Sequence, residues 1–245
     1  MNKLLTHYLP NKITLSNEKL DCFLIDLSLF DEELAKTYLA GEELSRADRL
    51  QLKAKRRQFT ISRALLRELL ASCLINTSPD NIEFYYGEHG KPSTNYTQLG
   101  KKIEFNISHT DHYVMIALCL ENSVGVDIES ISTRTDQASL VKRFFSQQEH
   151  DAWHALPETD RTDAFFRCWT RKEAFIKAEG SGVSYGLDNF SVSLEKNITK
   201  VEIDVQNTSD KADWTNYSSI ALSGYQTAIA SNQANLHITN HVITN

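Results

Sequence analysis

The sequence predicts a mixed α/β protein, because strand-like and helix-like patterns occur in both halves of the 245-residue chain. Hydrophobic residues make up 41% and charged residues 24% of the chain, which is typical of a soluble globular protein. A chain of this length forms one large domain or two compact lobes. A turn-like segment at residues 121–123 marks the expected division. We therefore expect an N-terminal lobe of residues 1–122 and a C-terminal lobe of residues 123–245.

In the first half, residues 20–30 predict an apolar strand, and Asp31 is the expected N-cap of a helix that ends near Gly41. Residues 45–74 have the apolar spacing of one long helix. A short strand is expected at residues 82–86, followed by the loop of residues 87–92.

Around the middle of the chain, residues 113–120 and 124–129 read as two strands joined by a hairpin turn. Helices are expected at residues 136–155 and 162–179, the second ending at Gly180. The remainder predicts further strands, among them residues 190–194, 201–205 and 220–230.

Composition excludes several functional classes. The net charge of −6 and the pI of about 5.8 leave no overall basic surface for nucleic acid. No run approaches the roughly 18 apolar residues that a membrane helix needs, and the N-terminus is too weakly apolar for a signal peptide. The four cysteines are far apart and lack C-x-x-C spacing, which favours buried, reduced thiols in a cytoplasmic protein.

Two carboxylates occupy alternate positions of the strand predicted at residues 124–129. Side chains alternate along a strand, so Asp127 and Glu129 share one face. Adjacent carboxylates repel each other unless a cation lies between them, and hard oxygen ligands suit magnesium. An edge strand with one solvated face is the alternative interpretation.

A second group of candidate residues lies on the helix predicted at 162–179. Trp169, Glu173 and Lys177 share one helical face because they are spaced four residues apart. The pattern could also be an ordinary surface ion pair between Glu173 and Lys177.

Two further segments could bind phosphate. Ser108 and His109 precede a strand and could donate hydrogen bonds to an anion, although such residues also favour turns. The helical pattern at 45–74 has a strongly basic face, which could alternatively be a solvated surface. Its cations are Arg46, Arg49, Lys53, Lys55, Arg56, Arg57, Arg63 and Arg67.

Read in order, five motifs resemble those of the 4′-phosphopantetheinyl transferases of the surfactin-type (Sfp-like) class. The resemblance covers about residues 45–190. The probability that five motifs agree in this order by chance is very small. The motifs are Gly90-Lys91-Pro92, Asn106-Ile107-Ser108-His109, Gly125-Val126-Asp127-Ile128-Glu129, Phe144-Phe145-Ser146-Gln147-Gln148-Glu149, and the run from Trp169 to Gly180.

The resemblance implies an α+β monomer of two similar, pseudo-twofold-related lobes, each a small, mainly antiparallel sheet packed on a long helix. Coenzyme A would bind between the lobes. Asp127, Glu129 and Glu173 would hold magnesium, with manganese as an alternative ion, and Glu149 would lie near the metal. Coenzyme A would contact Lys91, Pro92, Ser108, His109, Lys172 and Lys177, and its 3′-phosphate would contact Arg46, Arg49 and Arg57. The chain departs from the family at Gln58, where many members have arginine.

The implied reaction transfers the 4′-phosphopantetheine group of coenzyme A to a serine of an apo carrier protein and releases 3′,5′-ADP. Glu173, or a water that it holds, would accept the serine proton, with Lys172 and Lys177 as the other catalytic residues and Trp169 as a packing residue. Two other functions are alternatives: a non-catalytic module that binds carrier protein or coenzyme A, and a different magnesium- and nucleotide-dependent transferase. The absence of a G-x-x-x-x-G-K-[ST] or G-x-G-x-x-G sequence argues against the second.

Overall fold

The computed structural model of the protein describes residues 4–5, 7–8, 12–87, 90–133, 136–198, 200–205, 214–217 and 220–244. These residues form two compact units. The first unit comprises Met1–Tyr86, Pro92–Glu121 and His237–Asn245, and the second comprises Gly87–Lys91 and Asn122–Leu236. The units differ from the division at residue 122 mainly because the C-terminal strand belongs to the first unit.

The first unit contains a five-stranded sheet in the order β13-β1-β6-β5-β4. All neighbouring strands are antiparallel except β1 and β13. Its strands and helices are β1 (Lys19–Asp26), α1 (Glu32–Lys36), α2 (Gly41–Arg49), α3 (Lys53–Ser72), β2 (Tyr85–Tyr86), β3 (Pro92–Ser93), β4 (Thr97–Gln98), β5 (Lys101–His109), β6 (Tyr113–Leu120) and β13 (His237–Ile243).

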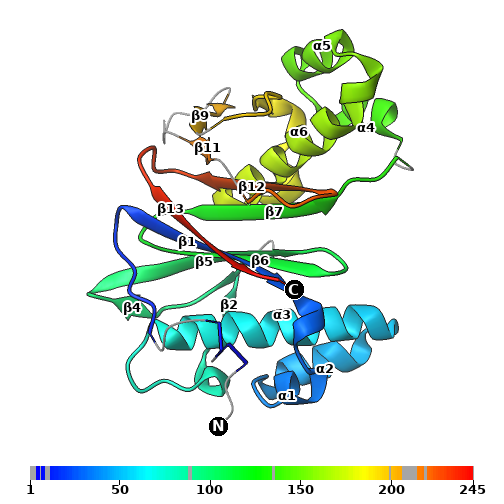
Figure 1. Cartoon of the computed structure of the whole chain (residues 1–245). Coiled ribbons are helices and arrows are strands. Elements are labelled where there is room, and N and C mark those ends of the chain that lie inside the picture. Colours follow the sequence, from blue (N-terminus) through cyan, green and yellow to red (C-terminus); the bar gives the residue numbers. More distant parts are fainter. Residues whose placement is uncertain are drawn as a thin grey trace. The chain divides into compact units, whose positions relative to one another are not determined.

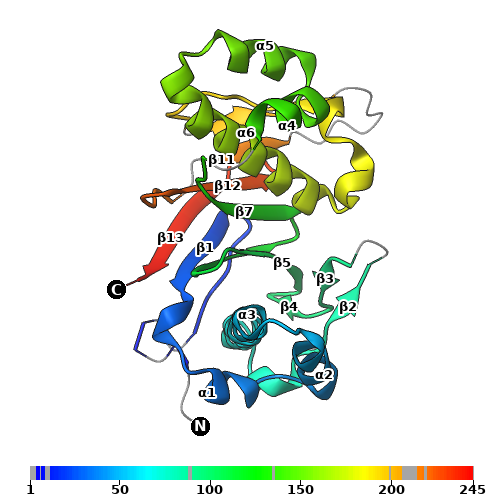
Figure 2. The ribbon, with the colours of Figure 1, turned by 90° about the vertical axis from the view of Figure 1, so that its right-hand side faces the viewer.

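The long helix α3 packs along one face of this sheet, as both views show (Figure 1, Figure 2). Its apolar side chains, such as Leu65 and Leu69, are fully buried against Phe23 of β1 and Ile116 of β6. The apolar runs predicted for residues 20–30 and 113–120 therefore form the central strands of the sheet. The predicted strand at 82–86 is reduced to the two residues of β2, which pair with β3.

The single helix predicted for residues 45–74 is wrong, because the chain breaks between α2 and α3. Leu50 and Leu52 are extended, with φ/ψ of −76°/109° and −81°/119°. The break lets Glu43 of α2 form ion pairs with arginines of α3 (described below). Gly41 also begins α2, whereas the sequence predicted that it would end the preceding helix, which stops at Lys36.

The second unit contains a four-stranded antiparallel sheet in the order β7-β12-β11-β9, with α6 packed over β7 and β12 (Figure 1). A small pair, β8 with β10, lies outside this sheet. The strands and helices of the second unit are β7 (Val124–Ser130), α4 (Gln137–Phe144), α5 (Gln147–Ala155), α6 (Glu158–Glu179), β8 (Phe190–Ser191), β9 (Lys200–Glu202), β10 (Asp204–Val205), β11 (Thr215–Tyr217) and β12 (Tyr225–Ser231).

Two predictions for this region are wrong. Strands β6 and β7 do not form a hairpin, because they belong to different sheets and residues 121–123 connect them. The helix predicted at 136–155 is two helices, α4 and α5. Ser146 separates them because its side chain accepts a hydrogen bond from the Glu149 amide, while Glu149 accepts one from the Ser146 amide in return.

Other predictions are confirmed. Mixed strands and helices with mainly antiparallel sheets form both units, and each unit has a sheet packed on a long helix. Gly180 ends α6 with φ of 97°, a left-handed conformation that favours glycine. All four cysteines are buried thiols. Within the residues described, none of the helices is long and apolar enough to span a membrane.

Helix α6 approaches β7 so closely that one position of the strand can hold only glycine. A Cβ atom at Gly125 would lie 1.9 Å from the Ala174 carbonyl oxygen and 2.5 Å from the Ala178 amide nitrogen. Both atoms are backbone atoms of a helix, so neither can move independently of α6. Gly125 therefore sets the distance between the strand and the helix.

We predict that Gly125→Ala destabilises the protein by about 3 kcal/mol, because the extra methyl overpacks a rigid contact. Thermal or urea unfolding measures the change. Gly41→Ala is the matched control, because a Cβ there meets nothing within 4 Å. Equal unfolding midpoints for the two variants would contradict the close packing of α6 on β7.

Candidate functional site

The candidate site is built on β7, the edge strand over which α6 packs. Gly125, Asp127 and Glu129 alternate along β7 and so share the face that Gly125 turns toward α6. Asp127 is buried, with 3% of its surface exposed, and Glu129 is partly buried. Two acidic side chains therefore lie under the helix in place of the apolar residues usual at such a contact.

The helix presents a matching polar stripe. Between Ala164 and Ala178, all of whose residues the structure describes, only Trp169, Glu173 and Lys177 are not fully buried. The spacing of four residues places them on one face, as the sequence predicted. The Lys177 ammonium lies 2.5 Å from the Asp127 carboxylate oxygen Oδ1, which joins the stripe to β7.

The carboxylates of this site perturb one another electrostatically. Burial, the Asp127 charge and the Glu173 charge raise the pKa of Glu129 to about 7, while Lys177 and a hydrogen bond from Trp169 act in the opposite direction. Burial and the Asp127 charge likewise raise the pKa of Glu173. The three acidic groups are thus close enough to repel one another, and Lys177 is the cation that offsets this repulsion.

The donor set suits a hard divalent cation, because all three acidic groups offer carboxylate oxygens. In the described part of the chain, however, no three His, Cys, Asp or Glu side chains already lie in an arrangement that could hold a metal ion. The Lys177 ammonium lies at the Asp127 oxygen that the resemblance assigns to the metal. The expected ligands therefore lie near one another without forming a closed coordination site.

Lys172 does not belong to this stripe, and its contacts within the fold do not support the predicted contact with phosphate. Its side chain is fully buried, and its ammonium lies 2.7 Å from Glu149 Oε2. It also donates hydrogen bonds to the carbonyl oxygens of Leu187 (2.8 Å) and Phe190 (2.7 Å). All three N–H groups of the ammonium therefore have partners inside the unit.

Glu149, which the resemblance implies lies near the metal, is also part of this internal network. Only 1% of its surface is exposed, and it accepts hydrogen bonds from the amides of Ser146 (2.8 Å) and Val192 (2.7 Å). It also forms the capping box of α5. Glu149 and Lys172 therefore join α5 and α6 to the segment that follows α6.

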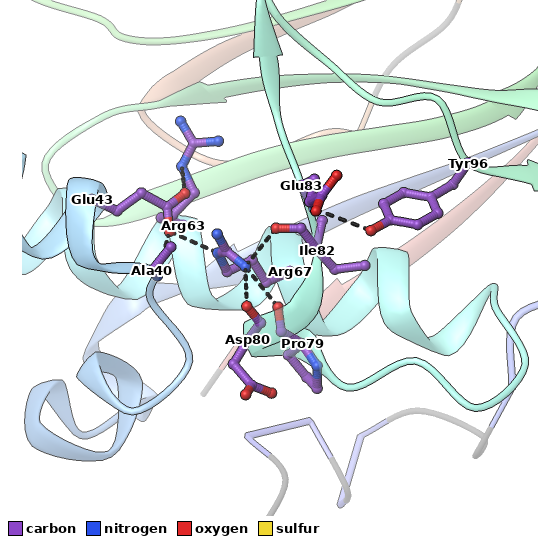
Figure 3. Close-up of polar contacts among 9 residues, drawn as sticks. All are labelled: Ala40, Glu43, Arg63, Arg67, Pro79, Asp80, Ile82, Glu83 and Tyr96. Carbon is purple, nitrogen blue, oxygen red and sulfur yellow. Dashed lines mark hydrogen bonds and ion pairs between the residues drawn. The ribbon is translucent and has the colours of Figure 1, made fainter.

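The basic residues of the first unit have three different environments. Glu43 forms ion pairs with Arg67 (2.7 Å between Nε and Oε2) and Arg63 (3.4 Å), which are both buried (Figure 3). Arg67 also donates to carbonyl oxygens between residues 79 and 82 (Figure 3). These two arginines stabilise the fold, so they do not form a phosphate-binding surface.

Arg57, expected to contact the 3′-phosphate, donates two hydrogen bonds to the carbonyl oxygens of Leu27 (3.0 Å) and Phe30 (2.8 Å). Its Nη2 group therefore holds the segment after β1, and the side chain is partly exposed. Arg46 and Arg49 lie on α2 and are exposed, and Arg46 stacks over the Phe59 ring at 5.1 Å. These two are the more accessible to an anion.

The other predicted contacts lie at strand ends and in the loop before β3. Ser108 is buried and His109 is exposed at the end of β5, and Pro92 begins β3. The Lys91 ammonium donates to the Ala178 carbonyl oxygen at 3.1 Å, in the last turn of α6, where a cation is favourable. The neighbouring Glu88 and His89 lie outside the described residues.

The effect of Trp169 on the candidate site was not predicted from the sequence. Trp169 was expected only to pack, and its ring does stack on Phe165 at 5.9 Å and meet Phe144 edge-on at 5.7 Å. Its indole also lowers the pKa of Glu129, which places it beside that carboxylate. The four-residue spacing from Glu173 was the available signal, because it placed the indole on the stripe that faces β7.

Comparison with known proteins gives matches over nearly the whole chain. Residues 123–230 match the family model of the 4′-phosphopantetheinyl transferase superfamily, and residues 30–121 match that of the N-terminal part of a 4′-phosphopantetheinyl transferase.

Individual relatives carry the same description. The 4′-phosphopantetheinyl transferase HetI of Nostoc sp. is 33% identical over 188 residues, which are 76% of this chain and 78% of the relative. The transferase Sfp of Bacillus subtilis is 31% identical over 69% of this chain and 73% of its own length. The transferase gsp of Aneurinibacillus migulanus is 33% identical over 72% and 73%.

We predict that Lys172→Met lowers the unfolding free energy by about 3 kcal/mol or more, because Glu149 would be left charged and unpaired in the core. Chemical denaturation measures the loss. Replacing both partners, with Lys172→Met and Glu149→Gln, should restore part of it.

Lys36→Met is the control, because Lys36 forms an exposed pair with Glu33 at 2.6 Å that should contribute little. If Lys172→Met unfolded at the wild-type midpoint, the ammonium would not be part of the fold.

Proposed function

The chain belongs to the 4′-phosphopantetheinyl transferase family and is an enzyme of that kind, and we propose that Asp127, Glu129 and Glu173 hold the magnesium ion of its reaction. The reaction transfers the 4′-phosphopantetheine group of coenzyme A to a serine hydroxyl of an apo carrier protein, with release of 3′,5′-ADP. The observation that carries the assignment is the facing of two β7 carboxylates and one α6 carboxylate, in which the Asp127 charge, after burial, raises the pKa of both Glu129 and Glu173.

Magnesium, when bound, would offset the negative charge that develops on the diphosphate during transfer. Manganese could serve in its place, because it also accepts oxygen ligands. The fit rests on the donors, which are all carboxylates, and on their mutual repulsion, which a divalent cation relieves.

We propose that the Lys177 ammonium has one position in the protein alone and another when the substrate is bound. In the protein alone, its ammonium lies against Asp127. With the divalent cation and coenzyme A bound, the ammonium would hold the diphosphate instead, and the Asp127 oxygen would be available to the cation. The long, flexible lysine side chain permits this movement, and an ammonium at the diphosphate stabilises the charge of the transition state.

Glu173 is proposed to accept the proton of the carrier serine. It is the carboxylate on the partly exposed stripe of α6, whereas Asp127 is buried beneath the helix. A general base must reach the hydroxyl from which it takes the proton, and exposure on the stripe favours Glu173 for this role. Trp169 is proposed as a positioning residue, because its indole lies beside Glu129 and lowers the pKa of that carboxyl group.

We propose the following contacts with coenzyme A. Ser108 and His109 would donate hydrogen bonds to phosphate oxygens, while Lys91 and Pro92 would border the nucleotide. Exposed guanidinium groups suit the 3′-phosphate, so Arg46 and Arg49 are the candidates. Lys172 and Arg57 are not included, because the Lys172 ammonium and the Arg57 Nη2 group donate to carbonyl oxygens within the fold.

We also propose that the enzyme acts as a cytoplasmic monomer without a nucleic-acid or membrane partner. The net charge of −6 does not favour nucleic acid, and the cysteines are buried thiols, as is usual in a reducing compartment. The carrier protein is the macromolecular partner, and only its apo form has the serine hydroxyl that reacts.

Replacing Asp127 with Asn or Glu173 with Gln should reduce transfer at least about 100-fold, because each change removes a metal-binding charge at nearly constant shape. The assay is the mass gain of an apo carrier protein incubated with coenzyme A and magnesium. Glu158→Gln, which changes an exposed carboxylate at the start of the same helix, is the control and should retain full activity.

The thermal shift produced by magnesium with coenzyme A should be lost in the same two variants. Near-normal turnover by either one, or an undiminished magnesium-dependent shift, would remove the metal assignment.

Replacing Arg46 or Arg49 with Gln should raise KM for coenzyme A by about tenfold, because a charge-assisted contact to the 3′-phosphate is lost. Dephospho-coenzyme A lacks that phosphate, so its KM should be the same for the variants and the wild type. Steady-state kinetics with both substrates measure the difference. Equal effects on the two substrates would show that these arginines do not contact the 3′-phosphate.

A further inference from the structure

The second unit contains a cavity of about 700 Å³ that the proposed reaction does not use. It lies among α6, the segment after β8 and the region of β11 and β12. Its lining includes three cations and two tyrosines, and none of its described lining residues is acidic. Those residues include Arg167, Arg171, Lys196, Tyr217, Tyr225 and Gln226.

Two of the cations are buried arginines. Arg167 is 8% exposed and Arg171 is 7% exposed, so both guanidinium groups are removed from bulk water. Arg167 donates from Nε to the Leu194 carbonyl oxygen at 2.8 Å, and Arg171 donates from Nη1 to the Ser193 carbonyl oxygen. A guanidinium group has five N–H donors, so these contacts use a minority of them.

Among the residues that the structure describes, no carboxylate lies within ion-pair distance of either guanidinium group. The more distant charges of Asp163 on Arg167 and of Glu195 on Arg171 offset only part of the cost of burial. Burial and the charge of Arg167 lower the pKa of Arg171 to about 10, and burial lowers the pKa of Arg167. Two like charges are therefore buried together beside a polar cavity. An anion in that cavity would relieve both the burial and the repulsion.

The arginine side of this cavity faces away from the candidate active site. With 3.6 residues per turn, Arg171 lies about 160° around α6 from Glu173. The arginines line the cavity together with Tyr217 of β11, and the cavity extends to Gln226 of β12, which pairs with Glu129 across the two strands. Glu173 and Lys177 lie on the other side of the helix, with Asp127 of the edge strand β7.

We propose that this cavity binds a small organic anion, whose phosphate or carboxylate group is held between the guanidinium groups of Arg167 and Arg171. Planar guanidinium forks match the paired oxygens of both groups. Lys196, which is exposed, adds a third positive charge to the lining. The volume accommodates a molecule larger than the anionic group alone, and Tyr225 offers it an aromatic surface.

Calorimetric titration of the full-length protein with inorganic phosphate and, separately, with succinate tests the proposal at ionic strength held constant with potassium chloride. Arg171→Met should weaken binding of the recognised anion at least about tenfold, because charge-assisted hydrogen bonds are lost while the aliphatic stem remains. Arg161→Met is the matched control. Arg161 lies on the same helix and also donates to carbonyl oxygens, of Leu156 and His154, but does not line the cavity.

The two titrations distinguish the possible ligands. Binding of phosphate alone, of succinate alone or of both, weakened by Arg171→Met and unchanged by Arg161→Met, supports the site and gives its class of anion. No binding of either anion, or equal weakening by both variants, overturns it. The result is independent of transfer activity, so its failure would leave the proposed reaction intact.

Labelling of the wild-type protein with phenylglyoxal tests the site without a variant. At an anion concentration ten times its Kd, modification of Arg167 and Arg171 should slow about tenfold. Modification of Arg143, which is exposed outside the cavity, should keep its rate. Peptide mass spectrometry measures the rates, and unprotected modification of both cavity arginines would overturn the proposal.

Discussion

The close approach of α6 to β7 is the constraint on which the candidate site depends. Because Gly125 has no side chain, the helix backbone can lie where a Cβ atom would otherwise be. Asp127 and Glu129 follow at alternate positions of the same strand, so the contact that buries Gly125 also brings both carboxylates under the polar stripe of α6. The resulting repulsion is an energetic cost that Lys177 offsets in the protein alone.

Much of this arrangement could be predicted from the sequence, because it depends on local periodicity. Alternation along the strand placed Asp127 with Glu129, and the four-residue spacing placed Trp169, Glu173 and Lys177 together.

The features that the sequence did not predict depend on partners that are distant in the sequence. Lys172 is adjacent to Glu173, but whether its ammonium points to a ligand or into the core is decided by Glu149 and by carbonyl groups of residues 187 and 190. The division of the predicted 45–74 helix likewise depends on Glu43 meeting Arg63 and Arg67.

The arginines show why a basic residue alone does not predict anion binding. Arg67 forms an ion pair with Glu43 and bonds to nearby carbonyls, and Arg57 bonds to backbone carbonyls, so both are part of the fold. Arg46 and Arg49 extend from α2 into solvent. Arg167 and Arg171 are buried like Arg67, yet no described carboxylate forms an ion pair with them. The burial of each side chain, its bonded partners and the neighbouring charges together distinguish these arginines. None of these three properties can be predicted from a run of basic residues in the sequence.

The pairing of β13 with β1 has a consequence for how the chain is made. The sheet of the first unit joins residues 19–26 to residues 237–243 through a parallel ladder, and His241 hydrogen-bonds the buried Asp21 at 2.7 Å. Almost all of the second unit is therefore inserted into the sequence of the first unit, between β6 and β13. During synthesis, all residues of the inserted unit are added to the chain before the C-terminal strand β13 leaves the ribosome. Until then, β1 has an unpaired edge that can recruit other strands.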